Sequence, residues 1–219
     1  EYGFDGLTGT QRALNRYGLG PVVESSYIRG STDVEAAVER IAGSEAEATF
    51  MIGTYDACAQ FIRLARRSRP GMLFYCVSFV GAEELVKLLG AEAEGVIVTQ
   101  VVPPPWETAL PAAEEYGTLL ARSFPDDRPN FVSFEGFINA KVLVEVLKHA
   151  GRELTRERFI ETVERMDVYA PGIGAVIRFG RNDHQGMDQV YLTVVKDGRL
   201  LPVQDQSGDR TADSPAEGR

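Results

Sequence analysis

Small, hydroxyl and aromatic residues follow two short apolar runs in the first half of the chain. Thr54 and Tyr55 come after one run, and Ser78 and Phe79 stand at the end of another. Tyrosine combines an apolar ring with a hydrogen-bonding tip, and serine and threonine can orient a polar group of a ligand. Asp56 is the one acid among them. These residue types suit holding a small molecule better than reacting with one.

Two more aromatic residues complete the candidate set. Tyr2 stands near the first residue, and Trp106 follows three consecutive prolines. Each member alone could be an ordinary strand-end or loop residue, but as a set at strand ends beside a crossing segment they favour a binding site. The candidate ligand-binding residues are Tyr2, Thr54, Tyr55, Ser78, Phe79 and Trp106.

Residues for catalysis or for a metal shell are scarce. The two histidines are His149, near a predicted helix C-terminus, and His184, beside Asp183 in a polar loop. His149 suits the negative end of a helix dipole. His184 has no second histidine or cysteine nearby to complete a metal shell, so we expect it to brace its loop by a hydrogen bond. Without a nucleophile elbow, a zinc motif or a phosphate-binding glycine loop, the sequence predicts no catalytic residue, no metal and no cofactor.

The two cysteines carry no redox motif. Cys58 shares a predicted helix face with Phe61 and Ile62, and Cys76 lies inside a predicted strand. Both have the surroundings of small buried apolar residues, and a redox pair would normally be closer in sequence. We therefore expect two free, buried thiols.

A parallel sheet must position the candidate site. Three apolar runs, Thr49–Gly53, Met72–Ser78 and Gly95–Val102, read as buried strands. Helical patterns over Asp56–Ser68 and Ala82–Leu89 separate them. This alternation is typical of an α/β fold with helices on both faces of the sheet. In such sheets ligands bind beyond the carboxyl ends of the strands, where the candidate residues stand.

The residues before these strands continue the same alternation. We predict a helix over Gly3–Tyr17, a strand over Val22–Tyr27 and a helix over Asp33–Ala42. Thr32 and Glu35 have the spacing of a capping box for that last helix.

The pattern changes after residue 102. The prolines of Pro103–Trp106 cannot supply the donors of a central strand, so this stretch reads as a stiff crossing segment. Three helices are predicted beyond it, over Leu110–Ser123, Phe131–Ala150 and Thr155–Met166.

The C-terminal region returns to strands. Ala175–Phe179 reads as a short strand, and Gln189–Val195 and Arg199–Val203 flank Asp197-Gly198, a strong two-residue hairpin signal. Residues 204–219 have almost no apolar side chains and are predicted to be disordered.

Composition limits the class of partner. The chain has 219 residues, 44% of them hydrophobic, and a net charge of -9. This length allows one large domain or two small ones. The negative charge argues against nucleic acid or an anionic membrane surface as a partner. No apolar run approaches the roughly 18 residues that a membrane span needs.

Several segments, taken together and in order, resemble one family. These segments are Glu1-Tyr2-Gly3, Arg29-Gly30-Ser31-Thr32-Asp33, Gly53-Thr54-Tyr55, Phe61–Arg66, Ser78-Phe79-Val80-Gly81, Val98–Pro103, Ser133–Phe137 and Asp183-His184-Gln185-Gly186. They resemble the type I periplasmic solute-binding proteins of the leucine/isoleucine/valine class, the substrate-binding components of ABC importers. The similarity runs over nearly the whole chain.

The resemblance implies two α/β lobes that are joined by three crossing strands and trap a ligand between them. It assigns residues 1–102 to the second lobe, 103–106 to a crossover, 107–186 to the C-terminal part of the first lobe and 187–203 to a hairpin that returns to the second lobe, with 204–219 as the tail. It also implies an N-terminally truncated piece, because the rest of the first lobe and the first strand of the second would precede Glu1. Helices from Leu110 onward would then lack their sheet and expose apolar side chains.

The resemblance also implies roles for individual positions. Tyr2, Thr54 and Tyr55 match family binding positions, and Ser78 matches a position that holds a carboxylate for the ligand ammonium in amino-acid binders. A serine cannot neutralise an ammonium, and burying an unpaired charge is costly. An α-amino acid would need another acid, such as Asp56 or Glu135. The family's carboxylate-binding Ser and Thr residues would precede Glu1.

The predicted function is capture of a small polar or amphipathic solute, such as an amino acid or a related compound, by a periplasmic or otherwise extracytoplasmic protein. The implied partner is the membrane permease of an ABC importer. One alternative keeps the fold and makes it the ligand-sensing domain of a signalling receptor. A second alternative is a flavodoxin-like or Rossmann-like enzyme, which needs a phosphate loop or a catalytic pair that the sequence lacks.

Overall fold

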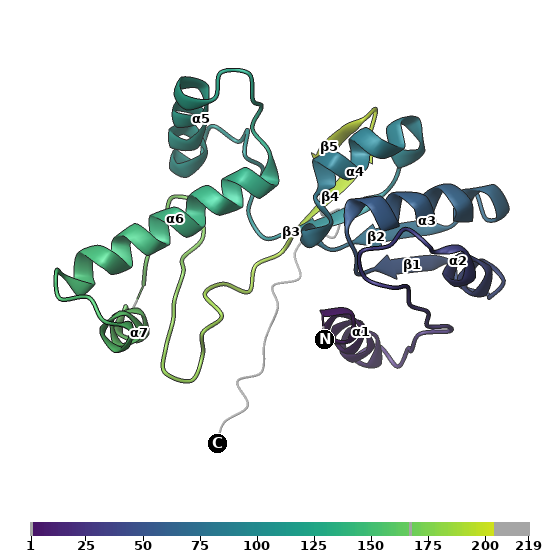
Figure 1. Ribbon diagram of the computed structural model, residues 1–219, viewed down its shortest axis with the longest axis horizontal. Coiled ribbons are helices and arrows are strands. Elements are labelled where there is room, and N and C mark those ends of the chain that lie inside the picture. The colour runs from purple at the N-terminus through teal and green to yellow at the C-terminus, as the bar shows by residue number, and fades with distance from the viewer. Residues whose placement is uncertain (1, 167, 204–219) are drawn as a thin grey trace.

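A five-stranded sheet forms the centre of the larger part of the molecule (Figure 1). The computed structural model describes residues 2–166 and 168–203. The first three strands are parallel, and the last two form an antiparallel hairpin on the edge of the third. In sheet order the strands are β1 (Ala48–Met51), β2 (Leu73–Cys76), β3 (Ile97–Gln100), β4 (Tyr191–Lys196) and β5 (Arg199–Pro202). The predicted α/β class and the parallel order of its three strands are confirmed.

Helices cover one face of this sheet. They are α2 (Glu35–Ala42), α3 (Tyr55–Ser68) and α4 (Ala82–Leu89). Side chains alternate between the two faces of each strand, so β2 buries Phe74 and Cys76 in the core and leaves Leu73 48% exposed. Leu192 of β4 is also exposed, by 45%. Helices were expected over both faces of the sheet, but only the face that carries Phe74 and Cys76 is fully covered.

Glycines set the ends of the predicted helix between β2 and β3. Gly81 and Gly90 flank α4 with φ angles of 74° and 57°, in the region that side chains with a Cβ avoid. The predicted bounds of α4 are confirmed to the residue. A short 3₁₀ turn, η1 (Ser78–Val80), joins β2 to this glycine, and a second turn, η2 (Gly90–Ala93), follows α4.

Three helices of the second half of the chain stand apart from the sheet (Figure 1). They are α5 (Pro111–Ser123), α6 (Phe131–Ala150) and α7 (Arg156–Arg165). The predicted bounds of α6 are confirmed, because Asn130 Oδ1 accepts a hydrogen bond from the Ser133 N–H (2.9 Å) at its start and Gly151 ends it. A hydrogen bond from the Phe131 N–H to Glu83 Oε1 (2.8 Å) connects this helical part to α4.

These three helices expose apolar side chains. Along α6, Val132, Leu143, Val144 and Leu147 are 37–57% exposed. No strand lies beneath α5–α7 in the part of the chain that the structure describes. The apolar surface expected for helices without their sheet is therefore present.

Three predictions of local structure were wrong. Residues 22–27 form no strand: β1 lies at the edge of the sheet, paired with β2 alone, and no described segment forms a ladder along its other edge. The capping box does not form: Val34 is the N-cap of α2, and Glu35 Oε2 accepts a bond from the Val34 N–H (3.1 Å) instead. Ala175–Phe179 contributes only one isolated bridge, between Tyr169 and Ile177.

Other predictions were confirmed. The N-terminal helix is α1 (Tyr2–Asn15), and the hairpin turns at Asp197 and Gly198, whose φ angles of 50° and 69° fit the predicted two-residue turn. Cys58 and Cys76 are free and buried. The tail predicted over 204–219 lies outside the described residues. Among the described helices, none is long and apolar enough to cross a membrane.

Candidate ligand-binding site

The carboxyl ends of β1 and β2 bring the two groups of candidate residues to one edge of the sheet. The strands are parallel neighbours, with Met51 opposite Cys76. Thr54 and Tyr55 therefore leave β1 beside the point where Ser78 and Phe79 leave β2. The α3 helix starts at Tyr55, so its N-terminus, with its unpaired backbone N–H groups, also lies at this edge.

Tyr2 reaches this edge from α1 and contacts Phe79. The ring centroids are 4.9 Å apart, with an interplanar angle of 51°. Tyr2 is 37% exposed and Phe79 61%, so the pair forms a partly open aromatic wall. The α1 backbone approaches β1 closely, because a Cβ on Gly6 would lie only 2.6 Å from Ile52 Cγ1. This close approach holds Tyr2 near the strand ends.

The other candidate residues at this edge retain free polar groups. Thr54 is the exposed N-cap of α3, yet its side chain makes no capping bond. Ser78 is half-buried, and its hydroxyl makes no hydrogen bond with the described part of the chain. The ring of Tyr55 lies beside Gly81, with Cδ1 3.4 Å from where a Cβ would stand. The Ser78 hydroxyl and the exposed ring of Tyr55 are thus available to a ligand, and the exposed Thr54 side chain lies between them and Tyr27.

Trp106 has a different neighbour. Its ring meets that of Phe131, at the start of α6, edge-to-face with centroids 5.3 Å apart. Among the described residues, no aromatic contact joins it to Tyr2 or Phe79. The structure thus brings five of the six candidate residues to one edge of the sheet and places the sixth, Trp106, against Phe131 at the start of α6.

Sequence reasoning missed Tyr27. A Cβ on Gly53 would lie 2.5 Å from Tyr27 Oη and 3.1 Å from Cys58 Sγ, so the phenol occupies the space that a side chain would fill. Tyr27 is half-buried and packs against the core. Tyr27 ends the segment that was predicted as a strand, so the rule used for Thr54 and Ser78 could have included it, although that segment forms no strand.

Two phenols at this edge keep their protons at neutral pH. Burial raises the pKa of both Tyr2 and Tyr27, and the nearby Cys58 thiol raises both further. Hydrogen bonding from Thr54 acts in the opposite direction on the pKa of Tyr27. Both phenols can therefore donate hydrogen bonds to a ligand.

Acids near the site are few. Asp56 is exposed in the first turn of α3. Glu135, on α6, is half-buried, and burial raises the pKa of its carboxyl group. Glu83 is engaged by the Phe131 N–H. No group of three or more metal-ligating side chains gathers within residues 2–166 and 168–203.

The histidines lie elsewhere. His184 Nε2 is 3.2 Å from Glu164 Oε1, which confirms the predicted loop-bracing bond. His149 Nδ1 lies 2.9 Å from the Glu145 carbonyl oxygen, one turn earlier in α6. Both are structural contacts at the surface of the helical part.

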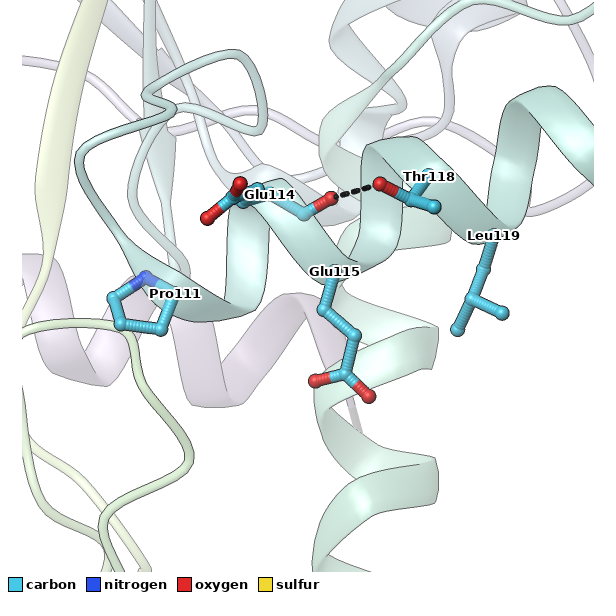
Figure 2. A pocket seen from close by; sticks show the side chains of 5 residues that line it. All are labelled: Pro111, Glu114, Glu115, Thr118 and Leu119. Atoms are coloured by element: carbon cyan, nitrogen blue, oxygen red, sulfur yellow. Dashed lines mark hydrogen bonds between the residues drawn. The ribbon is translucent and has the colours of Figure 1, made fainter.

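Two surface depressions on the helical part are weaker candidates. Figure 2 shows the first, which is lined by one face of α5. Its polar groups are engaged locally: the Thr118 hydroxyl donates to the Glu114 carbonyl (3.0 Å), and Glu115 pairs with Lys141. The second lies between α6 and α7, where Arg165 pairs with Glu161 (2.6 Å). The strand ends bring an aromatic pair and the unbonded Ser78 hydroxyl together beside a helix N-terminus, whereas the second depression is lined mainly by charged side chains that pair with one another. The lining residues of the first are Pro111, Glu114, Glu115, Thr118 and Leu119.

Known proteins share this architecture. A family model described as periplasmic binding protein matches residues 1–199. A possible leucine/isoleucine/valine-binding protein from Rhodopirellula baltica SH 1 superposes with a TM-score of 0.84 at 30% identity, over 92% of this chain and 56% of that one. A substrate-binding periplasmic protein from Ralstonia solanacearum superposes with a TM-score of 0.81 at 27% identity, over 92% of this chain and 58% of that one.

More distant structures share the fold alone. A branched chain amino acid ABC transporter from Thermus thermophilus with bound valine has a TM-score of 0.70 at 21% identity, over 88% of this chain and 54% of that one. This chain therefore spans about half the length of the solved structures it matches. No curated protein sequence is similar enough to count as a match.

Proposed function

Since this chain belongs to the periplasmic binding protein family, we propose that it contributes one side of a site that captures a small polar or amphipathic solute for an ABC importer. The observation that carries this proposal is the edge at the carboxyl ends of β1 and β2, where the Tyr2–Phe79 pair stands beside the unbonded hydroxyl of Ser78 and the exposed side chain of Thr54. Binding proteins of this kind work by closing two lobes on the ligand.

The solute proposed here is an amino acid or a related compound. The aromatic pair supplies an apolar wall and the hydroxyls supply polar contacts, which suits a short amphipathic molecule. Ser78 offers no charge to an ammonium group, and Asp56 is an exposed acid in the first turn of α3, which starts at the end of the neighbouring strand. Amides and carboxylates are therefore as well matched to this side of the site as α-amino acids.

The two alternatives have less support. The matched proteins are binding proteins, not enzymes, and the phosphate loop or catalytic pair that an enzyme needs does not appear among the residues of the site. A ligand-sensing receptor domain would use the same site and differ in its output. Family membership favours an extracytoplasmic location and a permease partner.

Titration calorimetry of the protein against L-valine, isobutyramide and isobutyrate tests this proposal. The three share one apolar body and differ in the polar group, so the ranking reports which head group the site prefers. We expect saturable binding of at least one, with a dissociation constant in the micromolar range or below, about -8 kcal/mol. Absence of heat for all three, and for a wider set of amino acids, amides and carboxylates, would contradict it.

A further inference from the structure

Tyr27 has a place at the strand ends that its packing role alone does not explain. Its hydroxyl lies over the Gly53 backbone, where a Cβ would approach it to 2.5 Å. The ring is only half-buried, and the residue after it, Ile28, is 76% exposed. The Tyr27 hydroxyl thus lies at the carboxyl end of β1, over Gly53, which has no side chain of its own.

Several other groups converge near this hydroxyl. Cys58 Sγ lies against the same face of Gly53, 3.1 Å from the Cβ position. The phenol of Tyr2 is close enough to Tyr27 for the charge of an ionised Tyr27 to raise the pKa of Tyr2, and Thr54 donates hydrogen bonds to the Tyr27 oxygen. Two phenols and one hydroxyl therefore lie together beside the N-terminus of α3.

The side chains of Tyr2, Tyr27 and Thr54 can all donate hydrogen bonds. Both phenols hold their protons at neutral pH, and a helix N-terminus favours negative charge. No carboxylate in the described residues is hydrogen-bonded to Tyr2, Tyr27 or Thr54. The matching ligand group is an oxygen acceptor, such as a carboxylate or an amide carbonyl.

We infer that Tyr27 is a further specificity-determining residue of the site, whose hydroxyl, seated over Gly53, donates a hydrogen bond to a carboxylate or amide oxygen of the solute. This inference rests on the proposed function. It adds one residue to the site and names the ligand group that this residue prefers. It also explains why residue 53 is a glycine, because any side chain there would displace the Tyr27 phenol.

Replacing Tyr27 by phenylalanine removes the hydroxyl and keeps the ring. We expect about tenfold weaker binding of isobutyrate and isobutyramide by calorimetry, since hydrogen bonds to such groups contribute on this scale. Tyr17→Phe is the matched control, because Tyr17 is 82% exposed and lies away from the strand ends; it should bind like the wild type. Gly53→Ala should weaken binding as Tyr27→Phe does, by displacing the phenol.

The outcomes separate this inference from the function it rests on. If the wild type binds a probe and Tyr27→Phe binds it equally well, the inference is overturned and the proposed function stands. If Tyr27→Phe lowers the unfolding midpoint while affinity at a temperature well below it is unchanged, the hydroxyl is structural only and the inference is again overturned. A wild type that binds none of the probes overturns both.

Discussion

Replacing Phe74 by alanine should lower the free energy of unfolding by about 3–5 kcal/mol, the usual cost of removing a buried phenylalanine. Phe74 is only 1% exposed and lies at the centre of β2, on the face that packs against the helices. The Arg66 guanidinium also lies over its ring, 5.2 Å from the centroid, so the substitution removes that contact as well. Urea unfolding followed by circular dichroism measures the change.

Leu73 provides a matched control one residue earlier in the same strand. It points to the less covered face of the sheet and is 48% exposed. Leu73→Ala should therefore cost well under half as much as Phe74→Ala, because a half-exposed side chain buries less apolar area. Equal losses for the two variants would contradict the assignment of the core to the helix-covered face.

Replacing Tyr2 by alanine should weaken solute binding at least tenfold and leave stability nearly unchanged. Aromatic residues at binding sites often contribute 2 kcal/mol or more to affinity, on the order of thirtyfold. Tyr2 supplies both the ring that contacts Phe79 and a donor hydroxyl. Its exposure of 37% and its place in a helix with no buried residue limit the effect on folding. Calorimetry with the tightest of the three probes measures the loss.

Phe4 is the control for this substitution. It lies two residues further along α1 and is 76% exposed, with no aromatic partner among the described residues. Phe4→Ala should bind the probe as the wild type does. A Tyr2→Ala variant that binds normally, or a Phe4→Ala variant that loses binding equally, would show that α1 contributes no specific wall to the site.

Much of the fold could be predicted because local signals agreed with the global arrangement. Ala82–Leu89 lies between two glycines with positive φ, and Phe131–Ala150 has an N-cap asparagine and a terminal glycine, so both helices were predicted with their observed bounds. The residue pair Asp197-Gly198 was enough by itself to predict the turn of the C-terminal hairpin. In each case the signal lies within the segment it defines.

Two of the three failures were segments whose structure depends on a distant partner. Val22–Tyr27 was predicted as a strand from its residue types, but a strand forms only where another strand pairs with it. The edge strand β1 is paired with β2 alone, and Val22–Tyr27 does not pair with its other edge. Ala175–Phe179 finds one bridging residue and no ladder. Local propensity does not contain this information.

The candidate site was predictable to the extent that it follows from parallel topology. Thr54, Tyr55, Ser78 and Phe79 were assigned to one edge of the sheet from strand order alone, and the structure has them there. Trp106 was included for its residue type, but it packs on Phe131. Tyr27 was omitted because its contact with Gly53 joins segments 26 residues apart in sequence. Whether these side chains bind a solute stays a prediction.

The most direct test of the central claim is fluorine NMR of the protein labelled with fluorotyrosine, titrated with whichever of the three probes binds tightest. The chain has eight tyrosines, and single Tyr→Phe variants assign their signals. Capture of the solute at the strand ends predicts that the signals of Tyr2, Tyr27 and Tyr55 shift together as the probe saturates, while Tyr17 and Tyr169 stay unchanged. Shifts confined to Tyr116 or Tyr169, on the helical part, would contradict a site at the carboxyl ends of β1 and β2.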